Sequence, residues 1–206
     1  MKTNISTCLL AVQLVLCALS RIARPAPITA PISAMDDFLN DTVETCWSLI
    51  KKIIDEIPIT HKSCIKVESL PLQDDLSRWE FMASSLGLPS AHTLTLSPND
   101  ISGTLSQILM GLQLHKAVLE TVKEPLSSPE DVKLLLADLD ELLVQISKVL
   151  KHVNTSPPPE PTLPDISSQL KDEYDVQVST HVTLLQLQRF GQEVFRFFRS
   201  LLSNDP

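Results

Sequence analysis

The side chains that most often carry catalysis or bind metals are present in this chain, but their spacing suits neither task. The five histidines include no His-Glu-x-x-His pair, the spacing that places two imidazoles on one helical face for zinc. The sequence also lacks a Cys-x-x-Cys pair, a Gly-x-Ser-x-Gly elbow and a glycine-rich phosphate loop. It therefore predicts no catalytic residue, no metal site and no cofactor, and it indicates a protein that is not an enzyme.

Composition narrows the class of protein further. The chain has 206 residues, of which 43% are hydrophobic and only 4% aromatic, so aliphatic side chains must build the core. Four glycines are too few for the many tight turns of an all-β fold, and the apolar content is too high for a disordered chain. A net charge of −8 argues against nucleic acid as a partner.

The N-terminal segment has the features of a secretory signal peptide. Lys2 supplies a positive charge, and residues 8–20 form an apolar stretch that is too short to span a bilayer comfortably. Ala18 and Ser20 are small residues of the kind that precede signal-peptidase cleavage. We expect residues 1–20 to be a signal peptide and residues 21–206 to be one secreted domain; a membrane anchor would need a longer apolar run.

Secretion determines how the remaining cysteines and asparagines are interpreted. Cys46 and Cys64 are the two cysteines left after cleavage, and an isolated pair in an oxidising compartment usually forms a disulfide. If the chain after Pro58 extends the preceding helix or runs onward, both thiols stay reduced instead. Asn40 and Asn154 each begin a glycosylation sequon and are expected at the surface.

Proline-free windows with apolar residues at three- and four-residue steps predict four long helices. Ser97-Pro98 and Ser128-Pro129 each supply an N-cap serine and a proline at the first helical position. β-branched residues between 176 and 183 weaken the signal at the start of the last helix. The predicted helices span about residues 34–57, 98–123, 129–153 and 168–203. The clearest apolar stripe consists of Val132, Leu135, Leu139, Leu142, Ile146, Val149 and Val153.

The lengths of the connections predict how these helices are arranged. A helix of about 24 residues is about 36 Å long, so a return to its starting end takes at least about 11 extended residues. Residues 124–128 are too few for that, whereas residues 58–97 and 154–167 are enough. This pattern predicts an all-α, long-chain four-helix bundle with up-up-down-down topology and two long crossover loops. The first crossover should hold a short helix within residues 74–86, with Leu76, Trp79 and Phe81 or Met82 docked on the bundle.

Short motifs resemble a known family. Ser85-Leu86-Gly87-Leu88-Pro89, Leu105-Ser106-Gln107-Ile108 with Gly111-Leu112, and residues 181–201 are similar to segments of the granulocyte colony-stimulating factor branch of the interleukin-6 cytokine family. The resemblance implies a secreted haematopoietic growth factor. Its partner would be a class I cytokine receptor of the granulocyte colony-stimulating factor receptor type, clustered to promote granulocyte-lineage proliferation and differentiation. Stable membrane insertion is not expected.

The resemblance also implies receptor-binding residues. The basic pair of the family's main site matches Lys51 and Lys52 on the first long helix, and its acids match Asp138 and Glu141 on the third. The glutamate of the second site matches Glu80 in the first crossover. The chain departs from the family at Ser48, where a glutamate is expected, and neither family disulfide can form.

Two alternatives share the amphipathic helices. One is another interleukin-6-type cytokine, and the other is a secreted helical lipid carrier that opens to expose its apolar faces. The last helix could likewise seek a membrane through its phenylalanines, but the better interpretation is that they fill the core while Arg189, Arg196 and Arg199 face outward.

Overall fold

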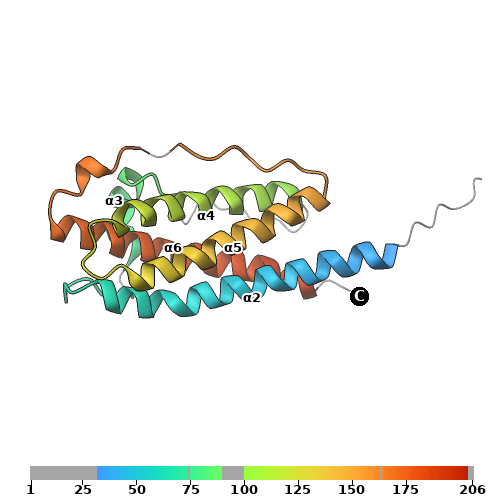
Figure 1. Cartoon of the computed structure of the whole chain (residues 1–206), viewed down its shortest axis with the longest axis horizontal. Helices are drawn as coiled ribbons and strands as arrows, with labels where there is room; N and C mark the ends of the chain where they lie inside the picture. The colour runs from blue at the N-terminus through green and yellow to red at the C-terminus, as the bar shows by residue number, and fades with distance from the viewer. Residues whose placement is uncertain (1–31, 74, 90–99, 163, 204–206) are drawn as a thin grey trace, which may run out of the picture. The chain divides into compact units, whose positions relative to one another are not determined.

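The computed structural model describes residues 32–73, 75–89, 100–162 and 164–203, with side chains from Asp37 onward. The chain divides into two units, Met1–Asp36 and Asp37–Pro206. Of the first unit only the start of one helix is described, and the predicted signal peptide lies outside the described residues. The described part of the second unit contains helices and no strand, which confirms the all-α prediction (Figure 1).

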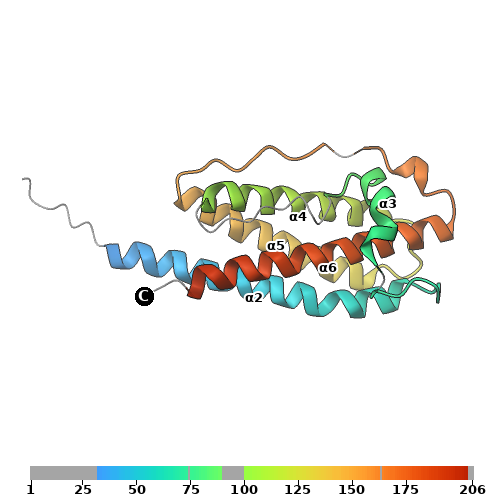
Figure 2. The ribbon, with the colours of Figure 1, turned by 180° about the vertical axis from the view of Figure 1, so that it is seen from behind.

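The second unit consists mainly of four long helices, and two short elements lie in the first crossover. The elements are α2 (Ile32–Cys64), the 3₁₀ helix η1 (Leu76–Trp79), α3 (Glu80–Ser85), α4 (Ile101–Lys123), α5 (Glu130–His152), the 3₁₀ helix η3 (Ser167–Gln169) and α6 (Glu173–Ser203). The crossover helix expected within residues 74–86 is therefore present as η1 followed by α3. The second crossover runs as an extended strap along the outside of α4, as the views from both sides show (Figures 1 and 2).

Contacts between distant parts of the chain show which long helices are neighbours. In each of three helix pairs, the residue numbers rise along one helix as they fall along the other, so the two helices run antiparallel. The contacts are Phe38–His152 and Lys52–Asp138 between α2 and α5, and Trp47–Phe195 and His61–His181 between α2 and α6. Between α4 and α5 they are Lys116–Asp140 and, just past the end of α5, Ser102–Thr155.

The core lies between the predicted apolar stripes. Every residue of the α5 stripe except the last is buried, and so are Cys46, Ile50 and Ile53 on α2. The phenylalanines of α6 are also part of the core. Phe190, Phe197 and Phe198 are buried, while all three arginines of that helix are exposed. The core-filling role predicted for these phenylalanines is confirmed.

The first half of α6 is buried on all sides. Residues 176–187 form an unbroken buried run, although a helix in a four-helix bundle normally has one face in water. The crossover supplies the missing cover, since η1 and α3 both pack on α6 (Figure 2). This burial explains why a segment with many β-branched residues is nevertheless helical: tertiary packing outweighs a small loss of propensity.

The boundaries of three helices differ from those predicted. Helix α4 begins at Ile101, because the Asp100 carboxylate accepts the amide hydrogen of Gly103 at 2.9 Å and caps the helix; residues 90–99 lie outside the described part. The N-cap of α5 is Pro129 itself, with no side-chain cap from Ser128. Helix α6 begins at Glu173 instead of 168, after η3.

Helix α2 is the largest departure, because it does not end before Pro58. It continues through this exposed proline to Cys64. Proline within a helix costs a hydrogen bond and a steric clash. The last turns offset that cost, since Thr60, His61 and Cys64 continue the buried face of α2 beyond Ile57.

The crossover docks through some of the expected side chains and not others. Trp79 packs edge-on against the His181 ring, with 5.2 Å between ring centroids, and Met82 is half-buried against the core. Phe81 is 88% exposed, so of the two alternatives, Phe81 or Met82, it is Met82 that docks on the bundle. The exposed position of Phe81 follows from helix periodicity, because Ala83, two residues later, is the buried side chain of α3.

Candidate functional site

A charged cluster bridges α2 and α5 at residues that the sequence had singled out. Lys52 Nζ lies 2.7 Å from Asp138 Oδ1 and 3.6 Å from Glu56 Oε1. The fold thus joins residues that lie 86 positions apart in the sequence. An ion pair of this kind, with the lysine more than half exposed and screened by water, contributes little to stability. The cluster is therefore better suited to presenting charge than to holding the fold together.

The electrostatics of the cluster favour a charged lysine and a less acidic glutamate. The hydrogen bond to Asp138 raises the pKa of the Lys52 ammonium. Burial, followed by the neighbouring Asp138 carboxylate, raises the pKa of Glu56. Asp138 Oδ2 is buried and has no hydrogen-bond partner within the described part of the chain. Lys52 therefore faces two neighbouring carboxylates, those of Glu56 and Asp138. One oxygen of Asp138 is left without a hydrogen-bond donor among the described residues.

The other two predicted residues of the main site lie on the same pair of helices. Lys51 is exposed beside Lys52 on α2. Glu141 is exposed on α5, where its carboxylate accepts a hydrogen bond from Gln145 at 2.6 Å. The structure thus places all four residues on α2 and α5, while their role in receptor binding stays a prediction.

Two exposed apolar side chains flank the cluster, and sequence reasoning missed both. Ile59, two helical turns after Lys52, is 63% exposed. Leu134, one turn before Asp138, is also 63% exposed. Steps of seven and four residues keep a side chain on the same helical face. The same rule identifies Glu56, four residues after Lys52, so a helical projection around the predicted residues could have found all three.

Glu80 lies on a different part of the molecule. It begins α3, which packs on α6, and it lines a small surface hollow with Gln186 of α6. Its neighbour is the exposed Phe81. The predicted second site therefore lies on elements other than α2 and α5. The exposed apolar side chain of Phe81 lies next to it in the sequence.

The predicted Cys46–Cys64 disulfide is contradicted by the path of α2. Both residues lie on this one helix, 18 positions apart, which corresponds to about 27 Å along its axis. A disulfide needs Cα atoms within about 7 Å. Both thiols are free and buried, and burial raises the pKa of Cys46 to about 12 and also raises that of Cys64. The structure agrees with the alternative in which the helix extends and the thiols stay reduced.

The two sequon asparagines differ in backbone conformation. Asn40 is exposed within α2. Asn154 is exposed just after α5 and has a left-handed φ of 57°. There the amides of Asn154 and Thr155 donate to the carbonyls of Lys151 and Leu150, which closes the helix in a Schellman motif. Occupancy of either sequon stays a prediction.

A buried polar contact near the end of α2 was also missed. His61 Nε2 lies 2.9 Å from His181 Nδ1, and burial lowers the pKa of His61. Four residues before His181 on α6, the Gln177 side-chain oxygen accepts the amide hydrogens of Lys66 and Val67. The two histidines are 120 positions apart, so no local pattern could reveal their contact.

No group of three or more His, Cys, Asp or Glu side chains in the described part of the chain could hold a metal ion. None of the described helices combines the length and apolarity needed to cross a bilayer.

Comparison with known proteins adds no family assignment. No family model matches the sequence, and no curated protein is significantly similar to it.

Proposed function

We propose that this chain is a secreted cytokine of the granulocyte colony-stimulating factor type, which binds and clusters class I receptors to promote granulocyte-lineage growth. The observation that carries the proposal is the contact between Lys52 and Asp138. Both residues match the main receptor site of the family that the sequence resembles, and they come from two helices that meet. The proposal includes secretion after removal of residues 1–20.

The proposal also includes an up-up-down-down path of the helices. Three antiparallel pairs support it: α2 with α5, α2 with α6, and α4 with α5. They fit a path in which α2 and α4 run one way and α5 and α6 the other. The five-residue connection between α4 and α5 and the long connections elsewhere agree with this path.

The chemistry of the α2–α5 surface supports a protein partner. Interfaces gain most of their affinity from a few apolar or aromatic anchors, and charges around them set orientation and association rate. Ile59 and Leu134 provide two exposed apolar side chains, and Lys51, Lys52 and Glu141 provide charges beside them. Glu80 and the exposed Phe81 give a second, smaller combination of the same kind on α3, suited to a second receptor chain.

Burial of the apolar stripes favours a cytokine over the lipid carrier. A carrier would have to open the bundle and expose side chains such as Ile50, Leu139 and Phe198, which are fully buried here. Flotation with phospholipid vesicles separates the two functions. Retained helical packing and no co-flotation support the cytokine, while flotation with loss of packing supports the carrier.

The function is tested on cells that each express one class I cytokine receptor. The secreted protein should trigger phosphorylation of receptor-associated kinases in cells with a granulocyte colony-stimulating factor-type receptor. A response only through another receptor of the interleukin-6 group would replace the proposed subtype. Absence of a response from every class I receptor, with folded protein present, would overturn the proposal.

A further inference from the structure

The chain contains a single tyrosine, Tyr174, which lies exposed at the start of α6. The residue is 56% exposed, and its hydroxyl makes no hydrogen bond with the described residues. Figure 1 shows the start of α6 at the end of the bundle where α2 also ends. The phenolic oxygen is therefore free to react with a modifying enzyme.

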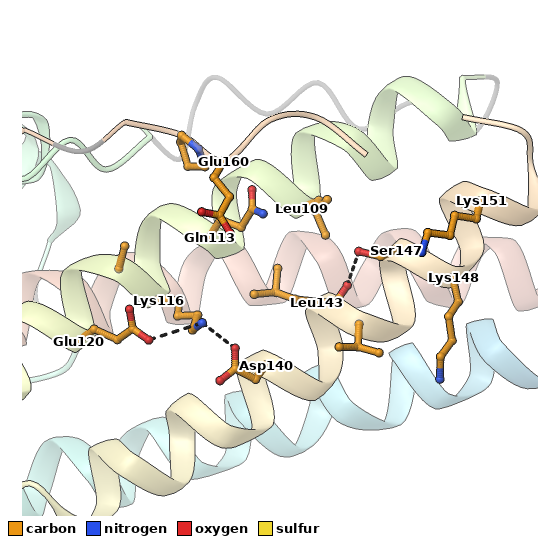
Figure 3. Close-up of a pocket in the computed structure, with 13 residues that line it drawn as sticks. Leu109, Gln113, Lys116, Glu120, Asp140, Leu143, Ser147, Lys148, Lys151 and Glu160 are labelled. Carbon is orange, nitrogen blue, oxygen red and sulfur yellow. Dashed lines mark hydrogen bonds and ion pairs between the residues drawn. The ribbon is translucent and has the colours of Figure 1, made fainter. Parts of the chain in front are cut away.

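Acidic residues flank Tyr174 on both sides. They are Asp172, Glu173 and Asp175. None of them pairs with a lysine or arginine side chain in the part of the chain that the structure describes. Figure 3 shows the opposite arrangement, in which Lys116 lies between the carboxylates of Glu120 and Asp140. The acids around Tyr174 therefore present negative charge that no neighbouring cation neutralises.

The backbone at Tyr174 can leave the helix without disturbing the core. Tyr174 is the second residue of α6, and amides in the first turn have no acceptor within a helix. Two hydrogen bonds hold this turn: Asp172 Oδ1 accepts the amide hydrogen of Asp175 at 2.8 Å, and the Asp172 carbonyl accepts that of Val176. Burial begins only at Val176. Because helix ends open locally at little cost, an enzyme that requires an extended substrate can bind residues 172–175 while the rest of α6 stays folded.

We propose that Tyr174 is sulfated during secretion, an inference that rests on the secretion included in the proposed function. Tyrosine sulfotransferases of the secretory pathway bind an anionic sulfate donor and select tyrosines beside acidic residues, so charge complementarity favours this site. The donor is a nucleotide phosphosulfate. The phenolic oxygen forms a bond to the donor sulfur as the bond from sulfur to the phosphate oxygen breaks. The nucleotide phosphate leaves, and the phenol proton passes to a base of the transferase. The product has a permanent negative charge at the N-terminus of α6, where the helix dipole stabilises it.

The test uses the full chain, expressed in animal cells with an active tyrosine sulfotransferase. After enzymatic removal of N-glycans, mass spectrometry of the protein in the medium should show one added SO₃ group that phosphatase does not remove. Chlorate, which blocks synthesis of the sulfate donor, should abolish this form. Tyr174→Phe should abolish it as well, because the chain has no other tyrosine.

Matched variants test recognition through charge. Glu173→Gln with Asp175→Asn keeps the acceptor oxygens that bind Gln177 and the Lys171 amide, and it should lower the sulfated fraction at least roughly five-fold. The control removes the same two kinds of acid elsewhere, by Glu120→Gln with Asp140→Asn, and should leave the sulfated fraction unchanged.

Three outcomes would overturn the sulfation and leave the proposed cytokine function standing. They are unmodified protein in the medium after loss of residues 1–20, an added SO₃ group that survives Tyr174→Phe, and equal sulfation of the two double variants. Retention of the unprocessed chain inside the cells would overturn secretion, and with it both proposals.

Discussion

Gly111 of α4 lies directly under the ring of Phe190 of α6. A Cβ added at residue 111 would come within 2.3 Å of Phe190 Cζ, closer than any real contact. Both residues are buried, and the ring also packs against His115 at 5.2 Å between centroids. The absence of a side chain at one position therefore sets how closely α4 and α6 can approach.

Gly111→Ala should destabilise the protein despite the better helix propensity of alanine. The propensity gain is about 1 kcal/mol, whereas overpacking a core costs about 1–3 kcal/mol. We expect a net loss that chemical denaturation can measure. Gly191→Ala is the matched control, because its Cβ would lie 3.1 Å from the nearest atom, on the flexible Ile54 side chain. If both variants have equal stability, the close approach at Gly111 is wrong.

Stability should fall as the pH decreases below about 6.5, because of His115. Burial lowers the pKa of this residue to about 4, and its Nδ1 lies 2.7 Å from the Gly111 carbonyl. The unfolded chain takes up the proton first, so the free energy of unfolding decreases between pH 6.5 and 4, by up to about 1.4 kcal/mol per pH unit. Burial lowers the pKa of His61 too, which adds a loss of the same sign.

Urea denaturation across this pH range measures the effect of His115. His115→Asn keeps a donor for the Gly111 carbonyl and removes the titrating group. This variant should show a shallower dependence of stability on pH than the parent. An unchanged slope would show that His115 does not titrate differently in the two states.

The secreted chain, after loss of residues 1–20, should contain two free thiols. Cys46 and Cys64 are too far apart on α2 to bond with each other. Thiol titration of denatured, unreduced protein should count both, while the folded protein should react slowly because both thiols are buried. A count of zero would mean that the end of α2 is not helical as described.

Asn154→Ala should destabilise the end of α5, and Asn154→Gly should not. The left-handed conformation at this position costs a residue with a Cβ roughly 1–2 kcal/mol, a penalty that asparagine tolerates better than alanine. Both changes destroy the sequon, so the proteins should be made in bacteria, without glycosylation. Thermal unfolding in which alanine and glycine variants melt together would argue against the Schellman motif.

Local patterns in the sequence predicted the long helices, but tertiary contacts decided their ends. The α5 stripe follows a period of 3.6 residues, which any buried helix must show. Pro58 was a strong local stop signal, yet burial of Thr60, His61 and Cys64 outweighed it. The disulfide was predicted from the isolated pair of cysteines, and the continuation of α2 to Cys64 is what rules it out.

The sequence predicted only part of the candidate site, because the rest depends on how the helices pack together. A resemblance of short motifs selected Lys52 and Asp138, and the structure places them in contact. Glu56, Ile59 and Leu134 were missed because a sequence match gives positions one at a time, whereas a surface is formed by all residues on two facing helices. Long-range contacts such as His61 with His181 require the fold itself.

The most direct test of the proposed function is the affinity of a receptor ectodomain for charge-reversed variants. Lys52→Glu should weaken binding at least roughly ten-fold, mainly by slowing association, because it reverses the charge that the α2–α5 surface presents. Lys116→Glu is the control, since Lys116 makes an ion pair of the same 2.7 Å length, with Asp140, between α4 and α5. Circular dichroism should show both variants folded. Equal affinity of the Lys52→Glu variant and the parent would contradict the placement of the receptor site on α2 and α5.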